Sequence, residues 1–198
     1  MNRFKWFNRA QKIMLALCSV FLIGGIFCTA VSQEEAAPMT NLEFFESLDY
    51  EDGLSVVTQT FDRLSLQYGT TLGLDGNPQI RPIEFKFEQD GVLYFDTVEF
   101  YSSYAELKAH PYIQLCVCDS ETMTYVRLGG KVNFTKDPAI VKRCFEESPV
   151  LTSQFGNNRT VVVAYYLTEA WAEFNSFTDG LPHRSYMLTN SFDTEVQP

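Results

Sequence analysis

The sequence has few of the residues on which hydrolytic and metal-dependent enzymes rely. Its 198 residues include two histidines and five cysteines. It contains no Gly-x-Ser-x-Gly nucleophile elbow, no phosphate-binding P-loop and no His-Glu-x-x-His zinc motif. These absences disfavour nucleophilic catalysis and a metal centre as the basis of its function. No catalytic residue or metal ligand is identified from the sequence.

Basic residues are also scarce. The chain has 15 Lys and Arg against 25 Asp and Glu, which gives a formal net charge of −10 at pH 7. Four of the basic residues and none of the acidic ones lie in residues 1–33, so the remainder carries −14. A nucleic-acid partner is disfavoured, because binding it requires cations that neutralise phosphates. The acidic surface of a soluble domain is enough to explain the charge.

The cysteines do not form a disulfide framework. Outside residues 1–33 there are three, Cys116, Cys118 and Cys144, which is an odd number. Cys116 and Cys118 are two residues apart, so on a strand they share one face without easy disulfide geometry. The two histidines do not complete a metal site with them. We therefore expect buried cysteines that belong to the core.

The N-terminus has the three parts of an export signal. A basic segment is followed by the apolar run Ile13–Val31 and by small residues at which a peptidase cuts. The run has 19 residues, so it also has the length of a membrane-spanning helix of about 20. Glu34 and Glu35 follow, and this charge asymmetry places the remainder outside. We expect an exported protein, secreted or held in the cell envelope, that contacts the membrane only through residues 1–33 if they are not cleaved.

The rest of the chain divides into three parts of different character. Residues 34–67 form a polar linker and two helices, residues 68–180 are rich in strands, and residues 181–198 form a tail. Alternating and continuous apolar segments between turn residues predict the strands. The predicted strands cover residues 68–74, 79–88, 92–95, 112–118, 122–134, 159–167 and 170–177.

The expected helices are single and irregularly placed among these strands. Thr40 and Glu43 have the spacing of a capping box, which predicts the start of the first helix. The four expected helices cover residues 42–50, 54–64, 101–109 and 136–148. This order favours a mainly β fold with flanking helices (α+β), a small barrel with helices over its openings. A two-sheet sandwich is the alternative, and the helices are too few for a parallel βαβ sheet.

Residues 74–111 hold the most distinctive order of elements. A strand after the turn at Asp75–Pro78 is followed by a hairpin, whose last strand leads directly into a helix near Tyr101. The first backbone N–H groups of a helix have no partner within it, and they bind anions. The segment therefore predicts an anion site at the start of this helix.

Three pieces in this order carry a resemblance to a known family. They are Gly76–Pro82 (GNPQIRP), Asp90–Thr97 (DGVLYFDT) and Tyr104–Pro111 (YAELKAHP). Together they resemble the pyridoxamine 5′-phosphate oxidase-like family of FMN-binding split barrels, and the likeness covers about residues 68–180. It implies a six-stranded split β-barrel, usually a homodimer with FMN between the subunits. It also implies an FMN-dependent oxidoreductase that acts on a small-molecule substrate.

The resemblance assigns nine residues to the cofactor: Arg81, Pro82, Lys86, Phe95, Asp96, Thr97, Tyr101, Ser102 and Ser103. By this likeness Arg81 contacts the flavin phosphate and Lys86 assists it. The strand end at residues 95–97 lies along the flat ring. A dianionic phosphate is bound well by guanidinium and N–H donors, so these assignments agree with the chemistry of the residues.

The chain departs from the family directly before the helix. Many relatives carry lysine or arginine there, whereas this chain has Phe100–Ser103, FYSS. Hydroxyl groups also donate to phosphate, but a lost charged hydrogen bond costs about 1.5–3 kcal/mol. We expect weaker FMN binding. The alternative is a non-catalytic barrel module that binds haem or another planar ligand.

Several of these residues also have a purely structural interpretation. Arg81 is then a solvated strand residue paired with an acid such as Glu84. Asp96 and Glu99 are surface acids of an acidic chain rather than a catalytic pair. The same two interpretations, groove or structure, apply to a further set: Tyr104, Tyr125, Arg127, Lys131, His183 and Arg184.

Overall fold

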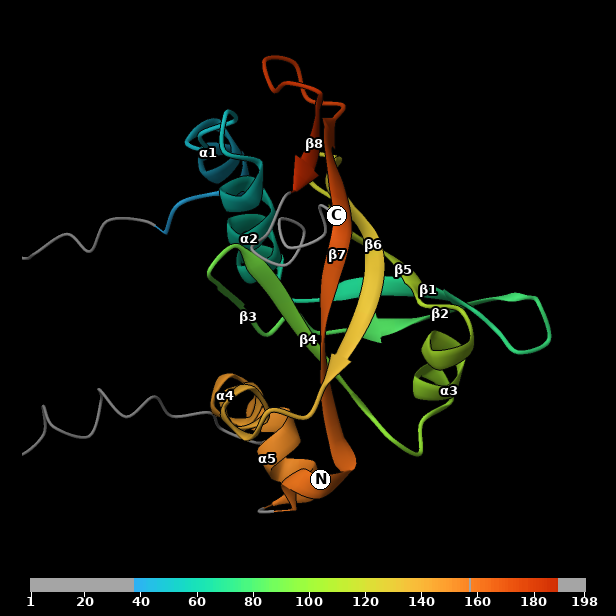
Figure 1. The fold of residues 1–198 in the computed structure, drawn as a ribbon. Coiled ribbons are helices and arrows are strands. Elements are labelled where there is room, and N and C mark those ends of the chain that lie inside the picture. The colour runs from blue at the N-terminus through green and yellow to red at the C-terminus, as the bar shows by residue number, and fades with distance from the viewer. Residues whose placement is uncertain (1–37, 157, 189–198) are drawn as a thin grey trace, which may run out of the picture. The chain divides into compact units, whose positions relative to one another are not determined.

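The computed structural model describes residues 38–156 and 158–188. The predicted leader, residues 1–33, and the last ten residues of the predicted tail lie outside this part. The described residues form an antiparallel sheet of eight strands with flanking helices (Figure 1). This confirms the predicted fold class, a mainly β fold with flanking helices. The sheet has eight strands, whereas the resemblance implies six. No helix in the described part is long and apolar enough to cross a membrane.

Eight strands and five α-helices make up the described part of the chain. The strands are β1 (Gln67–Leu72), β2 (Pro78–Ile83), β3 (Phe87–Gln89), β4 (Val92–Val98), β5 (Tyr112–Asp119), β6 (Thr124–Thr135), β7 (Val162–Ser176) and β8 (Arg184–Leu188). The helices are α1 (Asn41–Glu46), α2 (Gly53–Leu64), α3 (Ser102–Ala109), α4 (Pro138–Glu147) and α5 (Pro149–Phe155), with a 3-10 turn at Arg159–Val161.

The order of the strands makes the sheet a split barrel. It runs β2-β1-β5-β6-β7-β4-β3, and β8 pairs with β7. The two strands at the ends of this order, β2 and β3, are joined by three residues, Glu84 to Lys86. An extended chain spans at most about 3.5 Å per residue, so the two edges lie close together. The sheet therefore curls round without closing.

The prediction of a single strand at residues 79–88 is wrong, because this segment forms two strands, β2 and β3. The interruption is caused by a tertiary contact of Gln67, which is fully buried. Its side-chain oxygen accepts a hydrogen bond from the backbone N–H of Phe85 at 2.7 Å. A side chain thus replaces the neighbouring strand as partner of this amide, and the chain leaves β2 and joins β4 through β3.

The predicted strands at 159–167 and 170–177 are one strand, β7, with 15 residues. The irregularity that separates them in the sequence is a bend and not a break. Glu169 has φ of 51°, and the pairing of β7 with β6 shifts between Gly129 and Lys131. An irregularity of this kind bends a strand without ending it. Residues 159–161 form the 3-10 turn that precedes the strand.

All four predicted helices are present, with changes at their ends. The capping box of Thr40 and Glu43 is confirmed, although α1 ends at Glu46 and not at residue 50. Helix α5 is missing from the prediction because Ser148–Pro149 also has the composition of a helix end. In the structure Ser148 is the N-cap of α5, and Pro149 occupies its first turn, where no N–H is needed. Strand β8 lies in the predicted tail.

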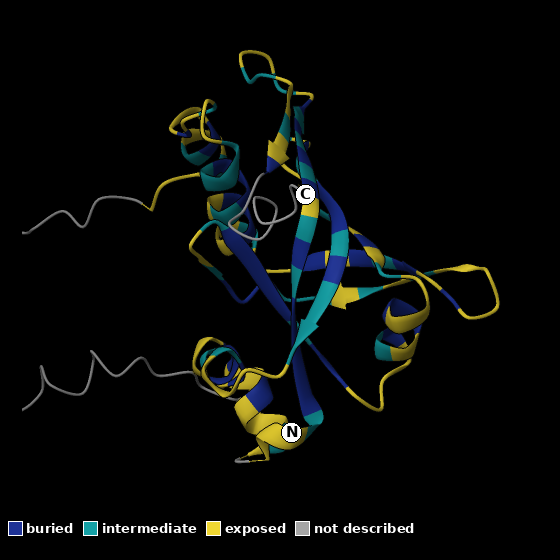
Figure 2. Cartoon of the chain, viewed as in Figure 1, coloured by how far each residue is buried: buried dark blue, intermediate teal, exposed yellow. Residues whose placement is uncertain are grey.

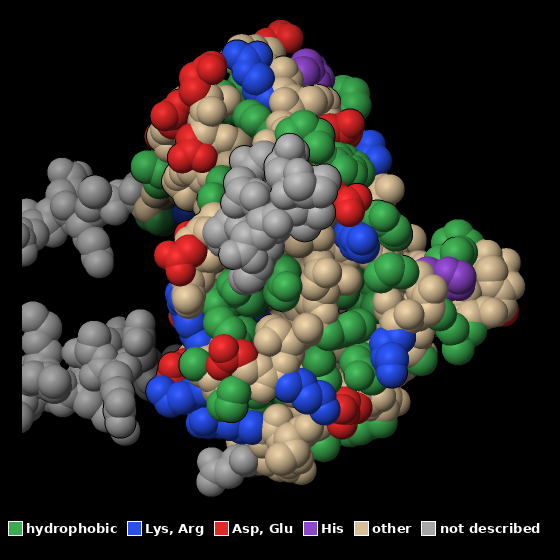
Figure 3. Space-filling view, in the orientation of Figure 1, with side chains coloured by type: hydrophobic (Ala, Val, Ile, Leu, Met, Phe, Trp, Pro, Cys, Tyr) green, Lys and Arg blue, Asp and Glu red, His purple; other side chains and the backbone are tan. Residues whose placement is uncertain are grey.

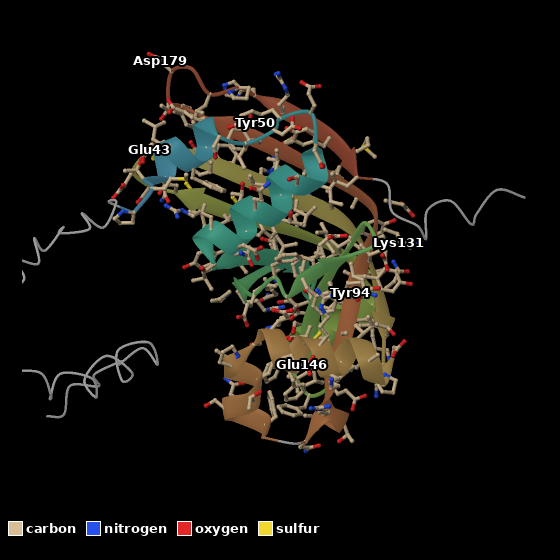
Figure 4. The ribbon with its side chains drawn as sticks, turned by 90° about the vertical axis from the view of Figure 1, so that its left-hand side faces the viewer. Glu43, Tyr50, Tyr94, Lys131, Glu146 and Asp179 are labelled. Carbon is tan, nitrogen blue, oxygen red and sulfur yellow. The ribbon has the colours of Figure 1, made fainter. Side chains whose placement is uncertain are left out.

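Two apolar clusters hold these elements together, one on each side of β4 (Figure 2). Phe95 faces the barrel interior, where α2 adds Phe61. Tyr94 faces the other side, where it belongs to one cluster with Phe145 of α4. Figure 4 labels Tyr94 on β4 and Glu146 on α4. Successive residues of a strand face opposite sides, so Asp96 lies on the α4 side and Thr97 on the barrel side.

The cysteines differ from the prediction in part. Cys144 is fully buried on α4, but Cys116 is half-buried and Cys118 is exposed. All three are free thiols. The alternation of β5 is the reason, because Leu115 and Val117 take the inward positions.

Candidate functional site

A cleft of about 280 Å³ opens where β2, the end of β4, α3 and α5 meet. Seven of the nine predicted cofactor residues line it: Arg81, Pro82, Lys86, Asp96, Thr97, Tyr101 and Ser103. These residues come from three separate parts of the chain, so the fold brings together what the sequence only lists. The remaining walls come largely from Ile83, Leu107 and the α5 residues Leu151 and Phe155.

Phe95 and Ser102 do not line the cleft. Phe95 is fully buried, and its ring stacks on that of Tyr165 with 5.4 Å between centroids. Its side chain therefore belongs to the barrel core. Ser102 is exposed at the first position of α3.

Arg81 is held by a small hydrogen-bonded cluster at the cleft. Its Nη1 atom lies 2.8 Å from Glu106 Oε2 and donates to Thr71 Oγ1 at 3.0 Å. The Thr71 hydroxyl in turn donates to Glu106 Oε2 at 2.5 Å. Arg81 is thus paired with an acid, as its structural interpretation predicts, but the acid is Glu106 of α3 and not the example given there, Glu84.

Glu106 is a buried carboxylate, with 7% of its side chain exposed. Burial acts to raise the pKa of Glu106, but the hydrogen bonds from Arg81 and Thr71 and the charge of Arg81 outweigh it. The pKa lies below its ordinary value as a result. Glu106 is thus an ionised partner that balances the charge of Arg81.

Lys86 forms a second cluster, with two acids. Only 3% of its side chain is exposed, and its Nζ atom lies 2.5 Å from Glu84 Oε2 and 3.2 Å from Asp96 Oδ2. The hydroxyl of Ser148 donates to the same Glu84 oxygen at 2.8 Å. Lys86 is therefore buried in the link between β2 and β3 rather than exposed on a strand edge.

Asp96 is the least satisfied member of this cluster. Its side chain is 13% exposed, so the interpretation of Asp96 as a surface acid is wrong, whereas Glu99 is exposed and paired with Lys136. Oδ2 of Asp96 is buried and has the Lys86 ammonium 3.2 Å away as its ion-pair partner, but within the described residues it accepts no hydrogen bond from a backbone N–H or a hydroxyl. Burial raises the pKa of Asp96, Lys86 lowers it in part, and Glu84 adds to the rise.

The start of α3 offers further donors. Tyr101 is its N-cap and makes no side-chain hydrogen bond there, so the first N–H groups of the helix are not capped by a side chain. The hydroxyls of Thr97 and Ser103 lie 3.0 Å apart and are hydrogen-bonded to each other. Within the described residues the hydrogen bonds of Arg81 use only Nη1. Its other guanidinium N–H groups, the hydroxyls and the helix start form a donor set that fits a phosphate group.

Two tyrosines line the cleft beside these donors. Tyr101 is 44% exposed, whereas Tyr165 is fully buried at the cleft floor. Burial raises the pKa of Tyr165, and the charge of Asp96 adds to the rise. Tyr104 faces away and packs on Phe134, with 5.0 Å between ring centroids. Of the aromatic residues on α3 and its cap, Tyr101 is thus the one placed against a ligand in the cleft.

The other candidate residues lie outside the cleft. Arg127 pairs with Glu173 at 2.9 Å, and Lys131 lies 3.5 Å from Glu169. His183 hydrogen-bonds Asn175. None of these residues lines the cleft, and the same is true of Tyr125 and Arg184.

Charged side chains are distributed unevenly over the surface. Acidic side chains gather over α1 and α2, and basic ones over α4 (Figure 3). The basic residues near α4 have acidic neighbours: Lys136 pairs with Glu99, Lys142 with Glu146 and Arg143 with Glu147. Within the described chain no group of three or more His, Cys, Asp and Glu is placed to hold a metal ion.

Among the residues that the prediction leaves out are Glu84 and Ser148, which line the cleft, and Glu106, which pairs with Arg81 behind it. Glu106 had one usable signal. It precedes the buried Leu107 on the same side of α3, where an acid needs a partner. Ser148 had another, since Ser followed by Pro also begins helices. Glu84 and Lys86 are two residues apart, which on the predicted strand puts both on one face. Their burial at the cleft depends on the link between β2 and β3, which the sequence does not show.

Comparison with known proteins agrees with this geometry. The family described as pyridoxamine 5′-phosphate oxidase matches residues 67–164. No curated protein matches the chain. A nimC/nimA family protein from Clostridium acetobutylicum has a similar structure, with a TM-score of 0.60, 18% identity, and coverage of 69% of this chain and 94% of that one.

Two further structures share the fold. One is a pyridoxamine 5′-phosphate oxidase-related, FMN-binding protein from Nostoc punctiforme, with a TM-score of 0.51, 15% identity and coverage of 71% and 97%. The other is a haem-binding protein from Mycobacterium smegmatis, with a TM-score of 0.54, 11% identity and coverage of 69% and 58%. At these identities the likeness shows the fold alone.

Proposed function

The chain belongs to the pyridoxamine 5′-phosphate oxidase-like family of FMN-binding split barrels, and from this membership we propose that it is an FMN-dependent oxidoreductase with a small-molecule substrate. The observation that supports the proposal most is the meeting of Arg81, the Thr97 and Ser103 hydroxyls and the uncapped start of α3 at one cleft. This donor set suits the phosphate of FMN.

The residues of the cleft have separate tasks in this proposal. Arg81 binds the phosphate through the N–H groups that Glu106 and Thr71 leave free, and Ser103 adds a hydroxyl. Tyr101 orients the flat part of the ligand, and Ile83 and Leu107 exclude water. When bound, FMN supplies hydride transfer at its ring, while the protein supplies orientation and electrostatics.

The affinity for FMN is expected to be lower than in relatives with a basic segment before α3. Each missing charged hydrogen bond costs about 1.5–3 kcal/mol, which is about one to two powers of ten in affinity. Arg81 is also shared with Glu106, so its charge is not fully available to the phosphate.

A second candidate is a non-catalytic module that binds haem or another planar ligand. The observation in its favour is the replacement of the expected bases by Tyr101, Ser102 and Ser103. Against haem stands the lining, which contains no His, Cys or Met in the described part of the chain. Tyrosine is then the remaining residue type that ligates haem iron, and Tyr101 is the exposed one.

We extend the proposal to a homodimer. The cleft of about 280 Å³ is slightly smaller than the 300–1,000 Å³ usual for small-molecule sites. Three large apolar side chains are exposed on the neighbouring strands β1, β2 and β5, namely Tyr68 at 50%, Ile80 at 71% and Tyr112 at 56%. Pro82 lines the cleft and shares this face of the sheet, whereas Arg81 points to the other side of β2. A second copy seated on the face would extend the cleft beyond Pro82.

One experiment tests the main proposal together with export. The protein is isolated from its host, and its mass and visible absorbance are measured. A flavin spectrum that disappears on reduction supports the oxidoreductase, and a mass lower by about residues 1–33 supports export with cleavage. A haem band supports the second candidate, and a colourless protein that takes up no added FMN contradicts the proposal.

A further inference from the structure

We propose that the part of the cleft formed by Glu84, Lys86 and Asp96 receives a positively charged hydrogen-bond donor of the substrate, such as an alkylammonium or amidinium group. As a statement about the substrate it rests on the proposed function. The recognition itself uses only residues of this chain, so it is measurable without flavin.

The first argument is the balance of charge. Lys86 is one buried cation between two carboxylates, those of Glu84 and Asp96. The other cation of the cleft, Arg81, is already balanced by Glu106. With every acid ionised the cluster of Lys86 carries one excess negative charge. A buried charge is costly unless it is paired, so a cation is the complementary ligand.

The second argument is the distribution of hydrogen bonds. Both donors of the cluster, Lys86 and Ser148, are directed at Glu84 Oε2. Asp96 lines the same cleft, and within the described residues its buried Oδ2 atom has no partner beyond the ion pair with Lys86 at 3.2 Å. More than about nine-tenths of buried polar groups in proteins have a partner, so an exception at a cleft calls for one. A ligand N–H group supplies what this oxygen lacks.

The third argument is what the surroundings of Asp96 do to its charge. It is faced by Lys86 and Glu84 of the β2–β3 link, by Cys144 of α4 and by Tyr165 of β7. Burial and Glu84 raise its pKa more than Lys86 lowers it. A bound cation favours the ionised form, so its affinity rises with pH as Asp96 ionises.

Anionic substrates are disfavoured by the same arrangement. A carboxylate or phosphate placed beside Asp96 would meet two like charges and one cation that is already paired. The cleft thus has two chemically different parts. Hydrogen-bond donors for a phosphate lie around Arg81, and carboxylates that accept from a cation lie around Lys86.

Titration calorimetry on the full chain, freed of flavin, tests the proposal with three probes of equal size. These are benzylammonium, benzyl alcohol and benzoate. We expect benzylammonium to bind at least about tenfold more tightly than the alcohol, because hydrogen bonds to charged groups are the stronger ones. Its affinity should rise with pH while the probe remains charged. Equal or tighter binding of benzoate, or no binding of the amine, would overturn the proposal.

Two variants and a control locate the site. Asp96→Asn should weaken benzylammonium binding about tenfold or more, and Glu84→Gln should weaken it in the same direction if the first variant does not fold. Glu99→Gln removes an exposed acid that follows β4 and lies outside the cleft, so it should leave the affinity unchanged. An equal loss in all three variants would show a general charge effect and would reject the site.

Separate measurement of FMN binding distinguishes this inference from the proposed function. If the protein binds the amine but no FMN, the cation site is supported and the proposed oxidoreductase function is rejected. If it binds FMN but not the amine, the proposed function is supported and the cation site is rejected. If Asp96→Asn lowers FMN affinity and leaves amine affinity unchanged, Oδ2 serves the flavin, and the inference is wrong.

Discussion

Arg81 and Glu106 show how much of the cleft depends on single side chains. Glu106 fixes the position of Arg81 and takes up part of its charge, while the remaining N–H groups of Arg81 face the cleft. Glu106 thereby orients the guanidinium of Arg81 for a phosphate, and at the same time it weakens the attraction between that guanidinium and the phosphate. The two effects are separable by mutation.

Arg81→Gln should lower FMN affinity by about one to two powers of ten, because a charged hydrogen bond to phosphate is lost. Flavin fluorescence titration measures this. Arg127→Gln is the matched control, since Arg127 is also paired with a glutamate but lies outside the cleft. A similar loss in both variants would contradict a phosphate site at Arg81.

Glu106 should make the protein sensitive to acid. Its pKa is lowered in the folded state, so its ionised form is stabilised by folding. That contribution is complete above its ordinary pKa of 4.5 and is lost as pH falls through the lowered value. Urea unfolding across this range should show a steeper loss of stability in the wild type than in Glu106→Gln. Parallel curves would contradict the assignment.

The ionisation of Asp96 affects stability in the opposite direction to that of Glu106. Its pKa is raised in the folded state, so the ionised form is disfavoured, and stability falls as pH rises above its ordinary value of 3.8. Asp96→Asn should therefore raise the free energy of unfolding at neutral pH, measured by urea titration, while Glu99→Gln leaves it nearly unchanged. A less stable Asp96→Asn protein would show that its pairing with Lys86 outweighs its burial.

At the scale of elements, α5 ties the cleft to the end of α4. Ser148 is fully buried, accepts from the N–H of Leu151 as N-cap and donates to Glu84. Ser148→Ala should cost about 1 kcal/mol for the lost cap, and more because Glu84 loses a donor. Ser153→Ala, in an exposed position of the same helix, is the control. Equal unfolding free energies of the two variants would contradict this role.

Elements with strong local signals could be predicted from the sequence, and those set by tertiary contacts could not. The capping box at Thr40 and the period of α2 are local. The break between β2 and β3 depends on the buried side chain of Gln67, some 18 residues away. The continuity of β7 depends on the bend at Glu169, which the sequence does not distinguish from a turn.

The candidate site shows the same division. Family likeness placed seven of nine residues at one cleft, because the order of strand, hairpin and helix is encoded locally. No spacing in the sequence relates Glu106 to Arg81. Glu84 and Lys86 are two residues apart, but the sequence does not show that they are buried together at the cleft. The likeness thus locates the cleft, and only the structure gives its charge balance.

At the scale of the whole molecule, the proposed homodimer depends on the exposed apolar face of β1, β2 and β5. Ile80 is 71% exposed on β2, the strand at the edge of this face. Ile80→Glu should convert a dimer into a monomer, because a charge buried at an interface without a partner is costly. It should also weaken FMN binding if the second copy extends the cleft.

Met187→Glu is the matched control for this experiment. Met187 is 75% exposed on β8, a strand that does not belong to the proposed interface. Light scattering should give a dimer for this variant and for the wild type, and a monomer for Ile80→Glu alone. A wild-type monomer that binds FMN would remove the homodimer from the proposal and make the cleft of a single chain sufficient. Because both variants add the same charge at similar exposure, a difference between them can only come from the face on which the charge lies.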